Sequence, residues 1–200
     1  MIKLMDKKIK ALINLAENLP GLGPKSARRI VLHLLKSKET TLIRFIDAMQ
    51  VLYETIKHCE LCGNLESESP CSICRNTKRS SDIVCVVEEI TDLWAIEKAG
   101  VHSGRYHVLN GALSIVNGIT PETLQIEKLK LKVSSGTVKE LIIATNATVE
   151  GQTTAQYIVE VLKEMQVKLS FLAHGIPVGS EMDYLDEGTL GIAFANRRAV

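Results

Sequence analysis

The chain has 200 residues, of which 46% are hydrophobic and 24% charged, and its formal net charge is +1. Such a chain can bury a core, so the composition excludes a disordered protein and allows one compact domain or two small ones. Five charged side chains among the first ten residues exclude a signal peptide and a membrane-spanning segment there, so we expect a cytoplasmic protein.

Charge is distributed unevenly along the chain. Residues 1–57 contain 11 Lys/Arg and 5 Asp/Glu, residues 58–80 contain 3 of each, and residues 81–200 contain 10 and 15. A polyanion such as nucleic acid should therefore contact the N-terminal part. Aromatic residues make up only 4% of the chain, which argues against a surface that stacks single-stranded bases.

Two amphipathic helices are predicted near the N-terminus, over residues 7–18 and 24–36, because apolar residues recur there at i, i+3, i+4 and i+7. The segment between them, L-P-G-L-G-P-K-S, has two glycines that permit a tight hairpin, and Pro24 suits the first position of a helix. Backbone N–H groups at such a turn and the positive end of the following helix attract phosphate oxygens. Basic side chains then form a stripe along the second helix, at Lys25, Arg29, His33 and Lys36.

By itself that stripe is typical of a solvated helix face, but the glycine hairpin beside it favours phosphate binding that is independent of base sequence. The run L-P-G-L-G-P-K-S-A resembles the helix–hairpin–helix motif of non-sequence-specific DNA-binding proteins. A Walker A loop is excluded because Pro24 separates Gly23 from Lys25, so nucleotide hydrolysis gains no support. The DNA-binding residues expected here are Gly21, Gly23, Lys25, Ser26, Arg28 and Arg29.

Residues 40–57 predict a third helix, which leads into a cysteine-rich segment. Large apolar side chains occupy much of it, more than one amphipathic face needs. We therefore expect this helix to be buried or to lie at a contact between subunits.

Four cysteines follow with the spacing C-x2-C-x8-C-x2-C, at Cys59, Cys62, Cys71 and Cys74. Two such pairs present four thiolates to one tetrahedral Zn²⁺ and leave no coordination position open for chemistry. Polar loop residues flank both cysteine pairs, and a segment of this kind does not form an ordinary apolar core. The pattern predicts one structural zinc ion, and an iron–sulfur cluster is the alternative that the same ligands can hold.

From Asp82 onward, short apolar runs alternate with helical segments. Strands are predicted at 84–87, 106–109, 141–144 and 167–172, and helices at 91–99, 121–130 and 151–165. This alternation predicts a mainly parallel sheet flanked by helices. Functional groups in such sheets gather beyond the carboxyl ends of the strands, and the candidates there are Glu88, Glu89, Asn146, Thr148 and Glu150.

The sequence V-V-E-E, followed far downstream by L-I-I-A-T-N-A-T-V-E-G, resembles a Toprim domain. Enzymes with this domain pair a glutamate with an Asp-x-Asp to hold Mg²⁺ for work on nucleic-acid strands. Glu88 matches the glutamate, but Asn146 and Thr148 occupy the two aspartate positions. An amide and a hydroxyl provide no negative charge for a hard divalent cation, so we expect no enzyme activity from this site.

A helix–hairpin–helix, a four-cysteine zinc module and a degenerate Toprim domain, in this order, resemble the RecR family of bacterial recombination mediators. The runs at 104–114 (G-R-Y-H-V-L-N-G-A-L-S) and 173–179 (A-H-G-I-P-V-G) are similar to characteristic runs of that family. Two departures are Ala147, where proline is usual, and Gln152, where an acidic residue is frequent. The resemblance implies an α+β protein of four modules, namely 1–57 with the helix–hairpin–helix, 58–80 with the four-cysteine zinc module, 81–176 with an α/β Toprim domain, and 177–200 as a helical tail.

By this resemblance we expect a non-enzymatic DNA clamp in recombinational repair, located in the cytoplasm and associated with the nucleoid. It also implies a ring-like homo-oligomer, a tetramer, that acts with RecO and RecF to help load RecA at single-strand gaps. Lys25 and Arg29 match the residues with which the family contacts duplex DNA. The partner-binding residues expected are Glu88, Glu89, Asn146 and Glu150.

The residues alone are also compatible with other functions. In an enzyme, Glu88, Glu89 and Glu150 would recruit Mg²⁺ for nicking or primer synthesis. The same three side chains are equally compatible with one acidic surface for a basic partner or with separate solvated charges. A pure scaffold would leave the basic stripe solvated, and a mobility assay with long duplex DNA separates the scaffold from the clamp.

Overall fold

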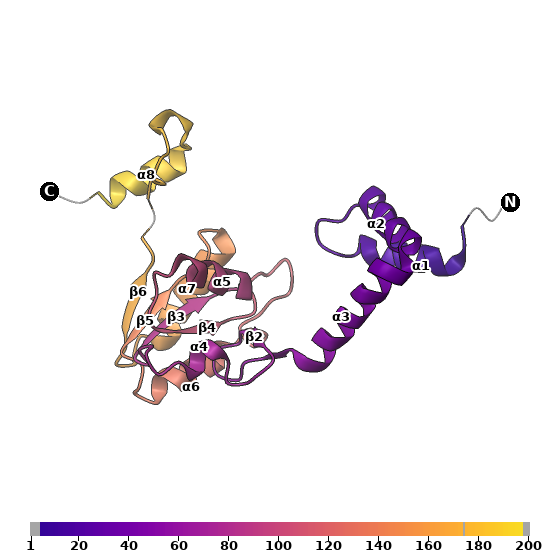
Figure 1. The fold of residues 1–200 in the computed structure, drawn as a ribbon. Coiled ribbons are helices and arrows are strands. Elements are labelled where there is room, and N and C mark those ends of the chain that lie inside the picture. Colours follow the sequence, from indigo (N-terminus) through magenta and orange to yellow (C-terminus); the bar gives the residue numbers. More distant parts are fainter. Residues whose placement is uncertain (1–4, 174, 198–200) are drawn as a thin grey trace. The chain divides into compact units, whose positions relative to one another are not determined.

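The computed structural model describes residues 5–173 and 175–197 and divides the chain into two compact units, Met1–Ile56 and Lys57–Val200 (Figure 1). His174, in the run A-H-G-I-P-V-G, and residues 198–200 of the expected tail lie outside the described residues. Each unit has hydrophobic core residues of its own.

The first unit contains α1 (Lys7–Glu17), α2 (Pro24–Lys36), a π-helical turn (Lys38–Leu42) and α3 (Ile43–Thr55). The first two helices begin and end within one residue of their predicted bounds. Asp6 caps α1 by accepting a hydrogen bond from Lys8 N at 2.8 Å. The two helices pack through apolar side chains, of which the buried ones are Ile13, Ala27 and Val31.

The third helix differs from expectation in two ways. It begins at Ile43, after the π-helical turn, whereas the apolar pattern predicted a helix from residue 40. None of its residues is buried, and Phe45, Met49 and Tyr53 are 51%, 58% and 89% exposed. Of the two expected alternatives, burial of α3 within the described chain is therefore excluded, since the core of this unit is formed by side chains of α1 and α2. The subunit contact stays a prediction.

The second unit begins with a small module that carries the four cysteines. Its elements are the antiparallel strands β1 (Lys57–His58) and β2 (Leu65–Glu66) and the one-turn helix α4 (Ser72–Arg75). Gly63, between the two strands, has φ +87°, and a Cβ there would lie 3.1 Å from Val108 Cβ. The glycine therefore lets the turn after Cys62 lie directly against the larger part of the unit.

That larger part is a four-stranded parallel sheet with the order β4-β3-β5-β6. Its strands are β3 (Ile83–Val87), β4 (Arg105–Val108), β5 (Glu140–Ile143) and β6 (Lys168–Phe171). The connections contain α5 (Ile90–Ala99), α6 (Ile126–Ser134) and α7 (Val149–Leu162). The prediction of an α+β protein with a mainly parallel sheet is confirmed (Figure 1).

The helix predicted at 121–130 begins later than expected. Residues 121–125 form turns, and Gln125 N donates to Leu109 O at 3.0 Å. Because this bond ties the loop to the end of β4, the regular helix starts only at Ile126. The apolar spacing did not reveal the boundary, since buried apolar residues continue on both sides of it.

Alternate residues of β3 belong to two different hydrophobic cores. One set packs with α6 and α7, while Cys85 and Val87 pack on the opposite face with α5 and with all four cysteines of the small module. Because β4 is an edge strand, its free edge can pair with the module, and Val108 N donates to Cys62 O at 2.8 Å. The cysteine module is therefore part of the core of the second unit.

The C-terminal segment contains a 3-10 turn (Met182–Tyr184) and α8 (Glu187–Ala195). Asp186 caps α8 by accepting a hydrogen bond from Thr189 N at 2.9 Å, and no residue of this helix is buried. Within the described part of the chain, no helix is both long and apolar enough to cross a membrane.

Candidate nucleic-acid interface and metal centre

The hairpin between α1 and α2 leaves its backbone open to solvent. Gly21 has φ +77°, a conformation that glycine adopts without strain, and Leu22 N donates to Leu19 O at 3.1 Å to close the turn. Gly23 precedes α2 with φ −82°, and a Cβ placed on it would meet no atom within 4 Å. Neither strain nor packing in this unit requires glycine at position 23. Its missing side chain leaves room for an external group beside the N-terminus of α2.

The basic side chains expected to bind DNA are on the surface of the first unit. Those that are exposed are Lys25, Arg28 and Arg29, together with the neighbouring Ser26. Among the described residues, no acidic side chain forms an ion pair with any of them. A surface hollow of about 760 Å³ is lined by Ser26 and Arg29 and also by His33 and Lys36. The basic stripe is therefore accessible to a polyanion.

The four cysteines lie together inside the small module. Their sulfur atoms are all within 4.8 Å of one another, and each cysteine is at most 6% exposed. Backbone N–H groups point at the sulfurs, since Cys71 N is 3.3 Å from Cys59 Sγ and Asn64 N is 3.5 Å from Cys62 Sγ. Four sulfurs at this spacing, with N–H donors directed at them, fit the tetrahedral ligand set of a zinc ion.

Without a cation, Cys62 and Cys71 resist ionisation. Burial raises the pKa of Cys71 to about 11, and charge on Cys62 adds to the effect. The hydrogen bond with Cys74, followed by burial, raises the pKa of Cys62. Burial acts in the same direction on Cys59, but backbone N–H groups, that of Cys71 foremost, lower its pKa to about 7. A divalent cation removes the repulsion among the thiolates, so the cluster is chemically suited to a metal.

At the carboxyl end of β3, Glu88 is not presented at the surface. It is 6% exposed, and its carboxylate oxygens accept hydrogen bonds from Asn146 N at 2.7 Å and Asn146 Nδ2 at 2.6 Å. Asn146 follows β5, so the pair joins the ends of two neighbouring strands. The expectation of a solvent-facing Glu88 is corrected, because the asparagine that stands at an aspartate position supplies N–H donors to this carboxylate.

Glu89 and Glu150 lie at the N-termini of two helices. Glu89 is exposed before α5, and its N–H donates to Asp92 Oδ2 at 2.9 Å. Glu150 is exposed in the first turn of α7, after the N-cap Thr148. Acidic side chains are favoured at both positions by the helix dipole. In the part of the chain that the structure describes, the four cysteines are the only group of three or more possible ligands within 4.8 Å, so the three glutamates, Glu88 included, do not form one.

Comparisons with known proteins match every part of this arrangement. The family models that match are RecR, helix-hairpin-helix at residues 9–52, RecR, four-cysteine zinc finger domain at 56–76, Toprim domain at 82–173, and RecR, C-terminal at 175–198. The chain is 94% identical to the recombination protein RecR of Neorickettsia sennetsu over 196 residues, which are 98% of this chain and 100% of the relative. The chain belongs to the RecR family.

More distant members of the RecR family are also similar over nearly their whole length. The chain is 50% identical to the recombination protein RecR of Sinorhizobium medicae over 192 residues, which are 96% of both chains. It is 49% identical to that of a Bradyrhizobium species over 189 residues, 94% of this chain and 95% of the relative. The resemblance inferred from the sequence is confirmed, and the chain is a recombination protein.

The metal of this RecR chain follows from the match and the geometry together. The matched segment 56–76 is a zinc finger with four cysteine ligands, and the four clustered sulfurs are the ligands that such a finger needs. The chain therefore holds one structural zinc ion, and not the iron–sulfur cluster that the spacing alone allowed. All four ligands come from the protein, so the zinc supplies no open position for catalysis.

Sequence patterns did not reveal the ion pair that holds the segment after the zinc finger to the Toprim domain. Arg79 donates to both carboxylate oxygens of Glu97 in α5, at 2.7 and 2.9 Å, and to Gly104 O at 2.8 Å. Tyr106 Oη donates to the same carboxylate at 2.6 Å. Burial favours a higher pKa for Glu97, but these donors lower its pKa, so the carboxylate stays ionised. Only the fold brings these side chains together, because they are far apart in the sequence.

Replacing Gly151 by alanine is expected to destabilise the second unit by about 1–3 kcal/mol, the usual cost of overpacking. A Cβ there would lie 2.2 Å from Asn146 O and 2.5 Å from Glu88 Oε1, so the Glu88–Asn146 pair would have to open. Thermal unfolding followed by circular dichroism measures the effect. Gly191→Ala is the matched control, because its Cβ would meet no atom within 4 Å in α8. Equal Tm values for the two variants would contradict the packing role of Gly151.

Proposed function

We propose that the chain is a non-enzymatic DNA clamp that holds duplex DNA by sequence-independent phosphate contacts during recombinational repair. The observation that carries this proposal is the open backbone at Gly23, directly before a helix with exposed Lys25, Arg28 and Arg29. Phosphate oxygens would meet the free N–H groups at the start of α2, and the basic side chains would contact neighbouring phosphates. Such contacts position a protein on DNA without distinguishing bases.

The clamp would be a ring-like homo-oligomer, a tetramer built from the four modules 1–57, 58–80, 81–176 and 177–200. The exposed apolar side chains of α3, such as Phe45 and Met49, support contacts between copies, because soluble monomers rarely expose a long apolar row. Residues 1–57 carry all of the excess positive charge, with 11 Lys/Arg against 5 Asp/Glu. An oligomer would present several copies of this module to the same DNA, so that their weak phosphate contacts together give a higher affinity.

The second half of the proposal is that the chain recruits RecO and RecF and thereby helps to load RecA at gaps. The surface we assign to it contains Glu89, Asn146 and Glu150 at the ends of β3 and β5, with Glu88 holding Asn146 in place. Residues 81–200 have 15 Asp/Glu against 10 Lys/Arg, which suits a basic partner. A cytoplasmic, nucleoid-associated protein is part of the same proposal.

The competing function, magnesium-dependent strand chemistry, has less support. Both oxygens of Glu88 accept hydrogen bonds from Asn146, and Thr148 is engaged as the N-cap of α7. A hard divalent cation prefers several free anionic oxygens, which this site does not offer. Product formation that needs magnesium and disappears in Glu88→Gln would overturn the non-enzymatic proposal.

Replacing Gly23 by alanine tests the clamp. The added methyl group is expected to obstruct an N–H···phosphate contact and to weaken duplex binding by about 1 kcal/mol, roughly fivefold. Fluorescence anisotropy with two unrelated long duplexes measures the affinity, and the loss should be equal for both. Gly191→Ala serves as the control, and helix content by circular dichroism should be unchanged in both variants. Wild-type protein that binds neither duplex, or a Gly23→Ala protein of undiminished affinity, would reject the proposal.

A further inference from the structure

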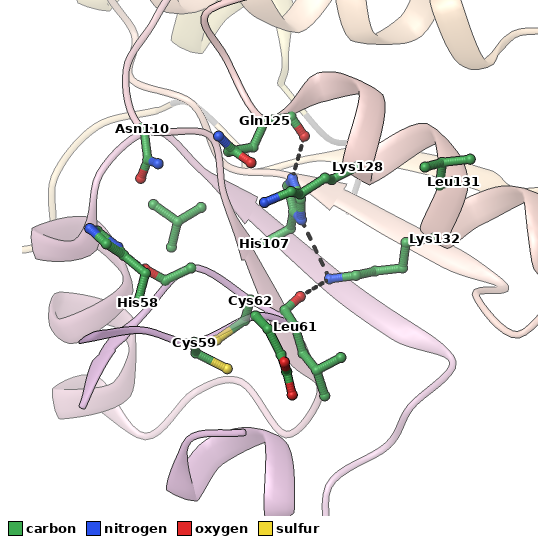
Figure 2. Close-up of a pocket in the computed structure, with 13 residues that line it drawn as sticks. His58, Cys59, Leu61, Cys62, His107, Asn110, Gln125, Lys128, Leu131 and Lys132 are labelled. Atoms are coloured by element: carbon green, nitrogen blue, oxygen red, sulfur yellow. Dashed lines mark hydrogen bonds between the residues drawn. The ribbon is translucent and has the colours of Figure 1, made fainter. Parts of the chain in front are cut away.

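The side chain of Lys132, from α6, extends toward the zinc finger (Figure 2). Its Nζ donates to Leu61 O at 2.6 Å, and Leu61 lies in the turn between the zinc ligands Cys59 and Cys62. The same nitrogen is 3.4 Å from Tyr106 O and 3.4 Å from His107 Nδ1. Each of the three ammonium protons therefore has an acceptor, and one acceptor belongs to the zinc finger.

The geometry fixes the state of His107. This ring is 3% exposed, and its Nε2 is 2.8 Å from Gln125 O, which can only accept a hydrogen bond. Nε2 therefore carries a proton, and Nδ1 is left as an acceptor for Lys132. Burial, with a further contribution from Lys132, lowers the pKa of His107 to about 3, so the ring is neutral near pH 7.

All three acceptors around Lys132 are neutral, so the positive charge of this side chain has to be balanced by another group. Among the described residues, no carboxylate forms an ion pair with it. Lys132 is half-buried, and a cation that is partly removed from water is destabilising without a balancing anion. Cys59, Cys62 and Lys132 line one hollow, and Cys74 and Lys132 line another, so the thiolates lie beside this ammonium group. Burial lowers the pKa of Lys132, and negative charge on the cysteines acts against this shift.

The zinc centre, in turn, is stabilised by positive charge placed beside it. Four thiolates around one Zn²⁺ leave a net charge of about −2 in a site whose cysteines are all buried. A cavity of about 190 Å³ next to this site is lined by Cys74, Lys132 and Arg105. The Nε atom of Arg105 is buried and has no hydrogen-bond partner among the described residues. Two cations thus lie on this side of the tetrathiolate, and Lys132 is the one with a direct contact to the ligand-bearing turn.

We propose that Lys132 is a positioning residue of the zinc centre, which fixes the Leu61 turn to α6 and balances the charge of the tetrathiolate. This ammonium group then adds a charge interaction to the packing and to the Val108–Cys62 hydrogen bond that already join the zinc finger to the Toprim domain. Loss of zinc leaves the half-buried Lys132 without its counter-charge, and loss of Lys132 leaves the tetrathiolate with one cation fewer.

The rate of zinc release from reduced protein to a chromophoric chelator tests this role. Lys132→Met has a similar length but neither charge nor donor, and it should release zinc about 10–100-fold faster, as expected for residues that support metal ligands. Lys139→Met, at an exposed lysine directly before β5, is the control and should release zinc at the wild-type rate, because Lys139 lines neither of the two hollows beside the cysteines. Unchanged release from Lys132→Met would overturn the proposal.

Two further variants separate the hydrogen bond from the charge. Lys132→Gln removes the charge and keeps an N–H donor, although its amide nitrogen lies one bond closer to the backbone than the lysine Nζ, so its release should be faster than wild type but slower than that of Lys132→Met. Lys132→Arg keeps the charge and should restore slower release than Lys132→Gln. If Lys132→Met yields no folded protein, the test is the comparison of Lys132→Gln with Lys132→Arg. Equal rates of zinc release from these two variants would refute the charge balance.

Thermal unfolding of zinc-loaded and chelated protein distinguishes this role from ordinary packing. Lys132→Met should lower the Tm of the zinc-loaded protein and leave the Tm of the chelated protein unchanged or higher, because without zinc it removes a half-buried, unbalanced cation. An equal decrease in both forms would show that Lys132 contributes only packing, and the proposal would fail.

Discussion

Replacing Cys71 by serine is expected to release the zinc ion and to unfold the part of the chain that follows Ile56. Cys71 is fully buried, and a serine hydroxyl is a poor replacement for a thiolate ligand. Structural zinc contributes about 10–16 kcal/mol in isolated zinc fingers, which equals or exceeds the total stability of about 5–15 kcal/mol of a typical domain. Because the cysteines belong to the same core as α5 and β4, the loss should spread into the sheet.

Metal analysis and thermal unfolding measure this effect. The zinc content should fall from one ion per chain to well below one, and the cooperative transition of the second unit should disappear. The helical signal of α1, α2 and α3 should persist, since the first unit has its own core around Ala27 and Val31.

Cys85→Ala is the control for the loss of a buried cysteine. Cys85 is 3% exposed and belongs to the same core, but it is not one of the four clustered cysteines, and burial raises its pKa to about 12. This variant should keep a full zinc content and lose only about 1–2 kcal/mol for the small cavity. A Cys71→Ser protein that retains one zinc ion and the wild-type Tm would contradict the assignment of Cys71 as a ligand.

Replacing Lys25 and Arg29 together by glutamine should have the largest effect on DNA binding. Both side chains are exposed without an acidic partner among the described residues, and each is proposed to contact one phosphate. The slope of log affinity against log salt should become less negative by about 0.9 for each lost contact, or roughly 2 in total. At moderate salt the affinity should fall about 10–100-fold, by a similar factor for unrelated duplexes.

The matched control removes the same charge from the same unit. Lys7 and Lys10 are exposed in α1, outside the hairpin, so Lys7→Gln with Lys10→Gln should change the salt slope much less. Equal losses in the two double variants would mean that binding depends on the net charge of the unit rather than on the hairpin. That outcome would contradict the proposed interface.

The local patterns predicted most of the elements. The spacing of apolar residues gave α1 and α2 to within one residue, and short apolar runs located all four strands of the sheet. The start of α6 was missed because a long-range hydrogen bond, from Gln125 N to Leu109 O, decides it. For α3 the sequence left burial and a subunit contact open, and burial within the described chain is excluded; apolar composition does not specify which surface covers a helix.

Both candidate sites could be located in the sequence. The zinc ligands were identifiable because metal geometry requires cysteines at short, fixed spacings, which are visible in one segment of the chain. The basic hairpin was identifiable for a similar reason, since its glycines, proline and lysine are consecutive. Both motifs depend on local conformation, so their residue types and spacing are enough to recognise them, while the DNA contacts of the hairpin stay a prediction.

Only the tertiary structure decided the roles of Glu88, Arg79 and Lys132. Glu88 is buried because Asn146, 58 residues later, donates to both of its oxygens, and Lys132 contacts Leu61, 71 residues earlier. Arg79 reaches Glu97 across 18 residues. A charged side chain is tolerated inside a protein only when partners satisfy it, and in this chain those partners come from other strands and helices. Their arrangement is set by how the parallel sheet and the zinc finger pack, which no local pattern of residues records.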